Sequence, residues 1–219
     1  MSALHSISIK GFKSISHIEN LPLGPINVLI GPNGSGKSNF IGVFSFLNAI
    51  HSKHLRRYVI QAGGADKVLH YGSKTTEELT IQIFFDEESY KYEIWLKATD
   101  ADALYVDGLH IELEATQSEH SGYQFVQSFD STSSDEVELP SWPESPQLEN
   151  DIKNHLDSWR LYHFHDTSSG SSMKKTADLN DNRFFRPDGA NLASFLYYLR
   201  EKHESSYSLI RRTVQRVAP

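Results

Sequence analysis

The chain has 219 residues and a formal net charge of −7, a length that suits about one to one and a half domains. Hydrophobic residues make up 38% and there is no cysteine, which excludes a disulfide scaffold and any zinc site with thiolate ligands. No apolar run approaches the roughly 20 residues that span a bilayer, and the N-terminus lacks the pattern of a signal peptide. We therefore expect a soluble cytoplasmic protein with no membrane partner.

Charge is unevenly distributed along the chain. Residues 98–152 contain thirteen acidic residues and no Lys or Arg, so this segment should repel phosphate and face away from nucleic acid. Basic residues gather at two other places, which we interpret as solvated helix faces. They are Lys53, Arg56 and Arg57 in the first place, and Arg200, Lys202, Arg211, Arg212 and Arg216 in the second.

Residues 1–66 predict an α/β core. Ile7 and Ile9 alternate with polar residues, which predicts a strand that is broken at Gly11. Residues 26–30 are almost wholly apolar, which is typical of a short strand buried on both faces in a parallel sheet. A helix is predicted over residues 38–51. Its expected packed face consists of Ile41, Phe44, Ser45, Leu47 and Ala49.

The middle of the chain predicts an antiparallel β subdomain over residues 67–129. Apolar and polar residues alternate from Val68 to Phe129 in a meander of about five strands. Asp107-Gly108, between two apolar triplets, predicts a two-residue type I′ hairpin. Residues 130–147 are rich in Ser, Asp, Glu and Pro and predict a surface loop.

Residues 148–219 predict a returning strand and a helical segment that continues beyond the end of the chain. We expect a helix over 148–157 and a strand over 159–164, followed by a polar loop. Two helices follow, the second over 205–217. The apolar side of the first of these consists of Leu192, Phe195, Leu196 and Leu199.

Residues 31–38 match the pattern G-x-x-x-x-G-K-[ST] in full, between the predicted buried strand and the predicted helix. Glycines let such a loop approach a phosphate so closely that its backbone N–H groups point inward, and the helix dipole adds attraction. Lys37 is the expected catalytic residue that reaches the β- and γ-phosphates, and the Ser38 hydroxyl is the expected Mg²⁺ ligand. The predicted nucleotide-binding residues are Gly31, Pro32, Asn33, Gly34, Ser35, Gly36, Lys37, Ser38 and Asn39.

The stretch Ile9-Lys10-Gly11-Phe12-Lys13-Ser14, together with residues 31–40, resembles the N-terminal lobe of SMC/RecF-type ABC ATPases. The resemblance implies a P-loop NTPase lobe of the ABC/SMC-head type that binds ATP and Mg²⁺, with an antiparallel β subdomain and C-terminal helices. It also implies that Phe12 and Lys13 lie near the base or ribose of the nucleotide. Arg56 or Arg57 could serve as an arginine finger, or simply as a charge at a helix C-terminus.

The same resemblance implies an ATP hydrolase that dimerises through its nucleotide sites and drives a DNA-directed or effector machine, as in DNA repair or phage defence. A signature motif, a Walker B Asp-Glu pair and a late His are not found in these 219 residues, so hydrolysis is expected only with a C-terminal half and a dimer partner. The alternative is a non-hydrolysing ATP sensor that holds a complex together. A GTPase is disfavoured because no Asn/Thr-Lys-x-Asp tetrapeptide occurs.

Several other residues have two interpretations each. Asp86 and Glu87 follow an apolar segment as in a Walker B strand, but they also fit a hairpin turn, which we favour. Residues 168–172 resemble a signature loop only faintly. His165 or Asp166 could replace the glutamine that bridges Mg²⁺ and water in ABC ATPases. The histidine pairs His51/His54 and His163/His165 lack a third ligand at metal-binding spacing, which favours structural or surface roles.

Overall fold

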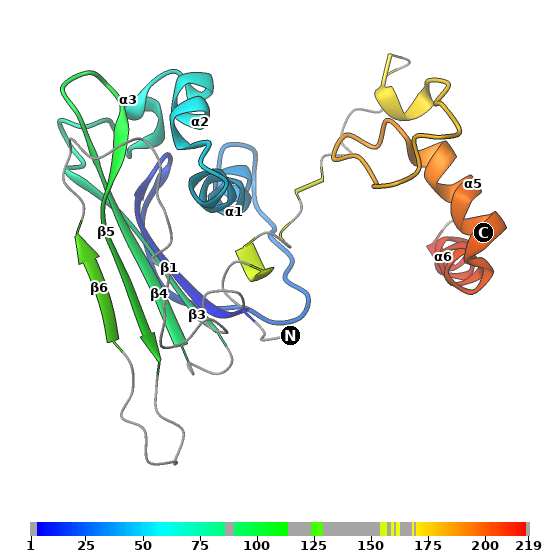
Figure 1. The fold of residues 1–219 in the computed structure, drawn as a ribbon, viewed down its shortest axis with the longest axis horizontal. Helices are drawn as coiled ribbons and strands as arrows, with labels where there is room; N and C mark the ends of the chain where they lie inside the picture. The colour runs from blue at the N-terminus through cyan, green and yellow to red at the C-terminus, as the bar shows by residue number, and fades with distance from the viewer. Residues whose placement is uncertain are drawn as a thin grey trace, which may run out of the picture. The chain divides into compact units, whose positions relative to one another are not determined.

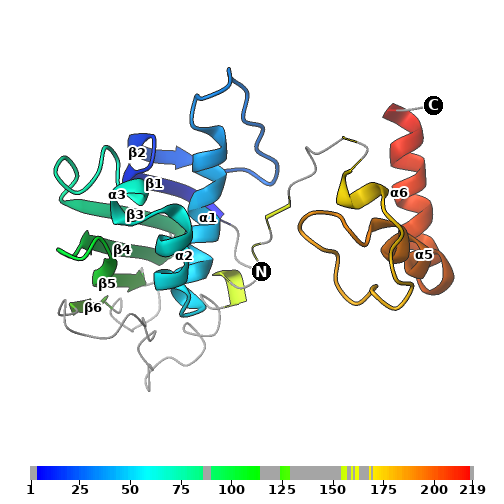
Figure 2. The ribbon, with the colours of Figure 1, turned by 90° about the horizontal axis from the view of Figure 1, so that it is seen from above.

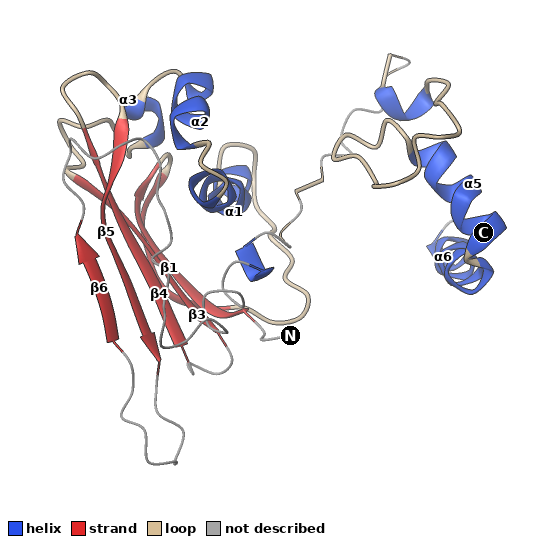
Figure 3. Cartoon of the chain, viewed as in Figure 1, coloured by secondary structure: helices blue, strands red, loops and turns tan. Residues whose placement is uncertain are grey.

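The computed structural model describes residues 4–85, 90–113, 124–128, 154–156, 159, 161–162, 168 and 170–217. They belong to two compact units, Met1–Trp159 and Arg160–Pro219 (Figure 1). The first unit is an antiparallel sheet with helices on one face, and the second contains helices and loops (Figure 3). The protein is therefore of the α/β class, with an antiparallel sheet. In the described part of the chain, no helix has both the length and the apolar character needed to cross a membrane.

The sheet of the first unit has six strands in the order β2-β1-β3-β4-β5-β6, and each strand is antiparallel to its neighbours. The N-terminal hairpin is part of this sheet, because Ile7 pairs with Ile83 and Ile9 with Ile81. The strands are β1 Leu4–Phe12, β2 Ile15–Pro22, β3 Glu78–Phe85, β4 Tyr90–Ala98, β5 Leu104–Leu113 and β6 Gln124–Ser128.

Strand β3 shows the alternation that its sequence predicts. Every second side chain, from Leu79 to Phe85, is buried, and the residues between them are half-buried. Phe85 pairs with Tyr90 at the start of β4, so β3 and β4 form a hairpin. Asp86 and Glu87 lie in the connection between these strands, outside the described residues. The half-exposed strand that favours a hairpin over a Walker B strand is thus confirmed, while the roles of the two acids stay predictions.

The hairpin predicted at Asp107-Gly108 is wrong, because β5 continues straight through both residues. The register on β4 shifts at this point: Trp95 pairs with Gly108 and Leu96 with Val106, which leaves Asp107 as the extra residue of a β-bulge. The Asp107 carboxylate forms an ion pair with Lys97 Nζ at 2.7 Å. Ladder pairing on both sides thus outweighs the local turn preference. The described residues between 68 and 129 form the four strands β3 to β6, where about five were expected.

Helices α1 Lys37–His51, α2 Leu55–Ala62 and α3 Ala65–Val68 cover one face of this sheet (Figure 2). The packed face of α1 differs from the expected one, since Ile41 is 39% exposed. The helix instead turns its larger apolar side chains to the sheet, at positions three to four residues apart. The side chains that α1 buries are Phe40, Val43, Phe46, Leu47 and Ile50.

Residues 26–30 do not form the buried strand that their composition predicts. Ile26, Val28 and Ile30 are 86%, 75% and 90% exposed, and no strand in the described part of the chain pairs with the segment. The Asn27 side chain instead binds both the amide and the carbonyl of Gly24, at 2.9 and 2.8 Å. A strand buried on both faces needs neighbouring strands and covering layers, and the described residues supply neither beside this segment.

The second unit contains a 3₁₀ turn, Ser172–Lys174, and the helices α5 Leu192–Lys202 and α6 Glu204–Val217. Both helices agree with the sequence prediction, although the expected apolar side of α5 is only half-buried. Of the predicted strand over 159–164, the described residues are not in a strand. Of the predicted helix over 148–157, residues 154–156 are helical, and the remainder lies outside the described residues, as does the loop at 130–147.

Candidate phosphate-binding site

The site is built around the loop of residues 31–36, which leads directly into α1. Gly36 is the N-cap residue of α1 and has φ 90°, and Gly34 has φ 84°. These left-handed conformations are readily adopted by glycine and are strained for other residues. Ser35 donates its amide to the Pro32 carbonyl at 3.3 Å, which closes a turn inside the loop.

The N-terminus of α1 is suited to an anion. No side chain caps it, and its first turn contains no acidic residue. The first amide that finds an acceptor in the helix is that of Phe40, which donates to the Gly36 carbonyl at 2.8 Å. The amides of residues 37–39 therefore point out of the helix end without an intrahelical acceptor. Free amides and the positive end of the helix dipole together make a site that attracts phosphate.

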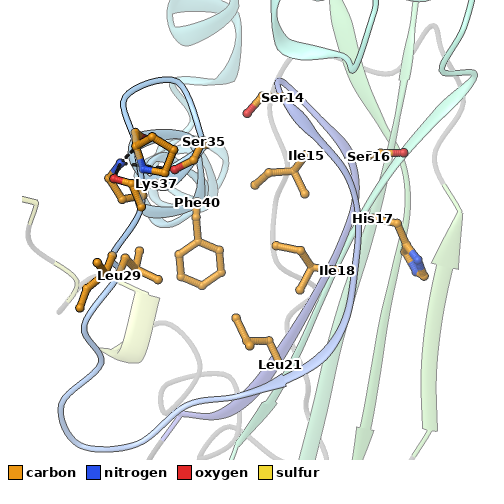
Figure 4. Close-up of a pocket in the computed structure, with 14 residues that line it drawn as sticks. Ser14, Ile15, Ser16, His17, Ile18, Leu21, Leu29, Ser35, Lys37 and Phe40 are labelled. Carbon is orange, nitrogen blue, oxygen red and sulfur yellow. Dashed lines mark hydrogen bonds between the residues drawn. The ribbon is translucent and has the colours of Figure 1, made fainter.

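Lys37, the first residue of α1, folds back over the loop. Its Nζ donates hydrogen bonds to the carbonyls of Gly31 and Pro32, at 2.8 and 2.7 Å, and to Ser35 Oγ at 3.3 Å (Figure 4). The ammonium group of Lys37 thus lies at the loop whose bound phosphates it is expected to contact. The hydroxyl of Ser38, one residue further, is on an exposed residue of the first helical turn, where a hydrated cation could reach it. The residues present fit a nucleoside phosphate with Mg²⁺.

A cavity of about 500 Å³ opens between this loop and β2, a size within the usual range of ligand pockets. Figure 4 shows Phe40 in its middle, with Ile15, Ile18 and Leu21 of β2 on the facing side. The side chain of Leu29 lies on the side of the loop. The site therefore combines a polar loop with an apolar wall, as a ligand with a phosphate end and a less polar body would require.

The turn between β1 and β2 carries the predicted residues Phe12 and Lys13. Phe12 is fully buried, with its ring centroid 5.3 Å from that of Phe46. This burial corrects the expectation that Phe12 lies beside the base or ribose, because a core ring cannot contact a ligand. Lys13 stays a candidate, with its Nζ 5.4 Å from the ring centroids of both Phe12 and Tyr58.

Ser14, at the end of the same turn, is not among the residues that the sequence predicts for the site, but it lines the cavity. Asn39 Nδ2 donates a hydrogen bond of 2.7 Å to Ser14 Oγ, so the turn and the start of α1 are directly joined. The two residues are 25 positions apart in the chain, and only the motif that contains Ser14 could have drawn attention to it. The contact also places Asn39, a predicted binding residue, beside the loop.

Two further predicted residues, Arg56 and Arg57, do not line the cavity beside this loop. Arg56 and Arg57 are exposed residues in the first turn of α2, so they are not charges at a helix C-terminus. The role of Arg57 at the nucleotide stays a prediction. His165 and Asp166 lie outside the described residues.

His51 lies at the C-terminal end of α1, opposite to the loop, and connects this end to the sheet. Its Nε2 is 2.7 Å from the hydroxyl of Tyr92 on β4, and its Nδ1 is buried without a hydrogen-bond partner. Burial lowers the pKa of His51 from its ordinary value near 6.5 to about 4, and burial raises the pKa of Tyr92. The pair is neutral at physiological pH and acts as a structural anchor for the helix. Within the described residues, no three His, Asp or Glu side chains gather as metal ligands.

Comparisons with known proteins agree with this geometry. Residues 3–133 match the family described as the RecF/RecN/SMC N terminal domain. The chain is also similar to the Structural maintenance of chromosomes protein 1 of Saccharomyces cerevisiae, with 36% identity over 63 residues. That stretch covers 28% of this chain and 5% of the yeast protein, so the chain spans only a small part of this relative's length.

Proposed function

The chain belongs to the RecF/RecN/SMC N-terminal domain family, as the resemblance of residues 9–40 indicates, and on this premise we propose that it is the ATP-binding part of an SMC/RecF-type ATPase. Members of this family are ATPases that bind ATP with Mg²⁺ and dimerise. The observation that supports the proposal for this chain is the uncapped start of α1, which lies next to a glycine loop and the ammonium group of Lys37.

The proposal assigns a role to each group at the loop. The amides at the start of α1 hold the phosphates, and Lys37 exchanges the carbonyls of Gly31 and Pro32 for phosphate oxygens. Ser38 would hold the Mg²⁺, and that ion would supply positive charge against the phosphates. The apolar side chains of the cavity exclude water on one side of the nucleotide, where they strengthen electrostatic contacts.

The exposed segment 26–30 suggests that this lobe works together with further protein. Its apolar side chains are largely exposed, which is costly unless further protein covers them. We propose that the segment becomes a buried strand when the rest of the nucleotide-binding fold is present. Dimerisation through the nucleotide sites, and a DNA-directed or defence effector, are parts of this proposal that rest on analogy with the family.

A calorimetric titration with Mg-ATP tests the central claim. Wild-type protein should bind, and Lys37→Ala should bind at least about tenfold more weakly, because it removes a charged phosphate ligand. Lys10→Ala, which removes an exposed lysine of β1, is the matched control and should leave the affinity unchanged. Equal affinities of wild type and Lys37→Ala would overturn the assignment of the loop, and a preference for GTP over ATP would overturn the choice of nucleotide.

A further inference from the structure

We propose that the hydroxyl of Ser14 is an additional phosphate-binding group of this site, and that Asn39 holds it in the orientation needed. The proposal rests on the proposed function, since it concerns the same bound nucleoside triphosphate. It adds a ligand contributed by the β1–β2 turn, outside the loop of residues 31–38. The turn would thereby become a second wall of the phosphate site.

The position of Ser14 relative to the loop supports this role. Asn39 Nδ2 lies 2.7 Å from Ser14 Oγ, and a Cβ atom on Gly36 would lie only 3.0 Å from the same oxygen. The hydroxyl is therefore packed against the N-cap residue of α1, where the free helix amides begin. In Figure 4, Ser14 stands at the end of the cavity nearest to Ser35 and Lys37.

The direction of the hydrogen bond leaves the Ser14 proton available. A serine hydroxyl both accepts and donates, whereas the amide nitrogen of asparagine only donates. Because Asn39 donates to Ser14 Oγ, the oxygen acts as acceptor there and keeps its own O–H for another partner. Among the described residues, that O–H has no protein acceptor. A phosphate oxygen at the start of α1 would complete the pair.

The turn that carries Ser14 is held from its other side as well. Lys13 donates its amide to the Val68 carbonyl at 2.8 Å, and its own carbonyl is 2.7 Å from His70 Nδ1. The residue before Ser14 is thus fixed to the last residue of α3 and to the segment after it, and Ser14 itself is fixed to α1. A donor that is already held in place loses little conformational entropy when a ligand binds.

The test measures the affinities of Mg-ATP and of inorganic triphosphate for single and double variants. Ser14→Ala and Asn39→Ala should each weaken both ligands about tenfold, as expected for a hydrogen bond to a charged group. The double variant should be no weaker than Ser14→Ala, because Asn39 acts through Ser14. Ser14→Thr keeps the hydroxyl and should retain affinity. Ser16→Ala, at an exposed serine two residues away, is the matched control, and melting curves report on folding.

The outcomes separate this inference from the proposed function. If wild type binds neither ligand, or if Lys37→Ala binds both as wild type does, the proposed function fails. If binding depends on Lys37 but Ser14→Ala binds as tightly as wild type, only the role of Ser14 is overturned. Loss of ATP affinity with unchanged triphosphate affinity would show a contact to ribose or base and would contradict the phosphate contact. Additive losses in the double variant would contradict the positioning role of Asn39.

Discussion

The two units of the chain are stabilised in different ways. In the unit Met1–Trp159, the sheet and the helices α1–α3 share one continuous set of buried apolar side chains. In the unit Arg160–Pro219, no apolar side chain among the described residues is buried to this degree, and the buried side chains are those of Ser171, Asn191 and Ser194. Secondary structure without an apolar core is weak evidence of independent stability.

The units also differ in charge. Residues 1–159 carry 11 Lys and Arg against 22 Asp and Glu, a net charge of −11, and residues 160–219 carry 10 against 6, a net charge of +4. Helix α6 shows the contrast most clearly, since Leu209, Ile210 and Val214 are exposed beside three arginines. From this difference we expect the second unit to depend on a covering partner, whereas the first unit has an apolar core of its own.

Hydrogen exchange would show the largest difference between the units. The amides of β3 lie in the middle of the sheet, between β1 and β4, and should exchange only through global unfolding, at least about a thousandfold more slowly than unprotected amides. The amides of α6 should exchange nearly as fast as those of an isolated helix, because helices of about 12–15 residues are marginal in water. Equal protection of β3 and α6 would contradict the comparison.

Matched isoleucine substitutions test the same difference between the two units through the free energy of unfolding. Ile81→Ala removes a fully buried side chain from the middle of β3 and should lower the free energy of unfolding by about 2–5 kcal/mol. Ile210→Ala, at an exposed position of α6, should change it by less than about 0.5 kcal/mol. Denaturant titrations of both variants check the prediction, and similar losses would mean that α6 is covered as well as β3.

The elements that the sequence predicts correctly are those whose packing partners lie in the same unit. The alternation of β3 works as a signal because β1 and β4 pair with it on both sides, so each residue has the environment that its type implies. The helix after the glycine loop and the two C-terminal helices follow from spacing and length in the same way. The loop itself is visible as a motif because its glycines and lysine are contiguous.

The failures come from effects that act across the chain. Residues 26–30 are apolar enough for burial. An apolar sequence alone does not form a buried strand, however, because such a strand also needs neighbouring strands and covering layers. Asp107-Gly108 has the local chemistry of a turn, yet pairing with β4 decides its conformation. The burial of Phe12 against Phe46 and the contact of Ser14 with Asn39 join residues far apart in sequence, and no local pattern indicates such contacts.

Acid should act on the first unit through His51. Its pKa is near 4 when folded and near 6.5 ordinarily, so the unfolded state binds a proton first as the pH falls. Stability is therefore complete above pH 6.5 and is lost between pH 6.5 and 4, by about 2 kcal/mol at pH 5. His51→Gln should remove this part of the pH dependence in denaturant titrations, while His54→Gln, at an exposed histidine, should keep it. An unchanged pH profile in His51→Gln would contradict the burial of the anchor.

A smaller loss of stability than that at His51 is expected in the second unit, at Asn191. Its side chain donates to the carbonyls of Asp181 and Phe184, at 3.0 and 2.7 Å, and accepts the amide of Arg186 at 2.9 Å. Asn191→Ala removes all three bonds, but water can replace them because the partner residues lie at or near the surface, so the loss should be about 1 kcal/mol.

This loss should be confined to the loop that Asn191 organises, because no apolar core transmits it through the unit. Hydrogen exchange should then speed up about fivefold for the Arg186 amide, with no change in β3. Asn180→Ala, at an exposed asparagine of the same loop region, should leave the Arg186 amide as it is in the wild type. If Asn191→Ala instead speeds exchange throughout α5 and α6 together, the second unit folds cooperatively around this one polar side chain. The two units would then differ in that the core of the first is apolar and that of the second is polar. The expectation that the second unit depends on a covering partner would be wrong.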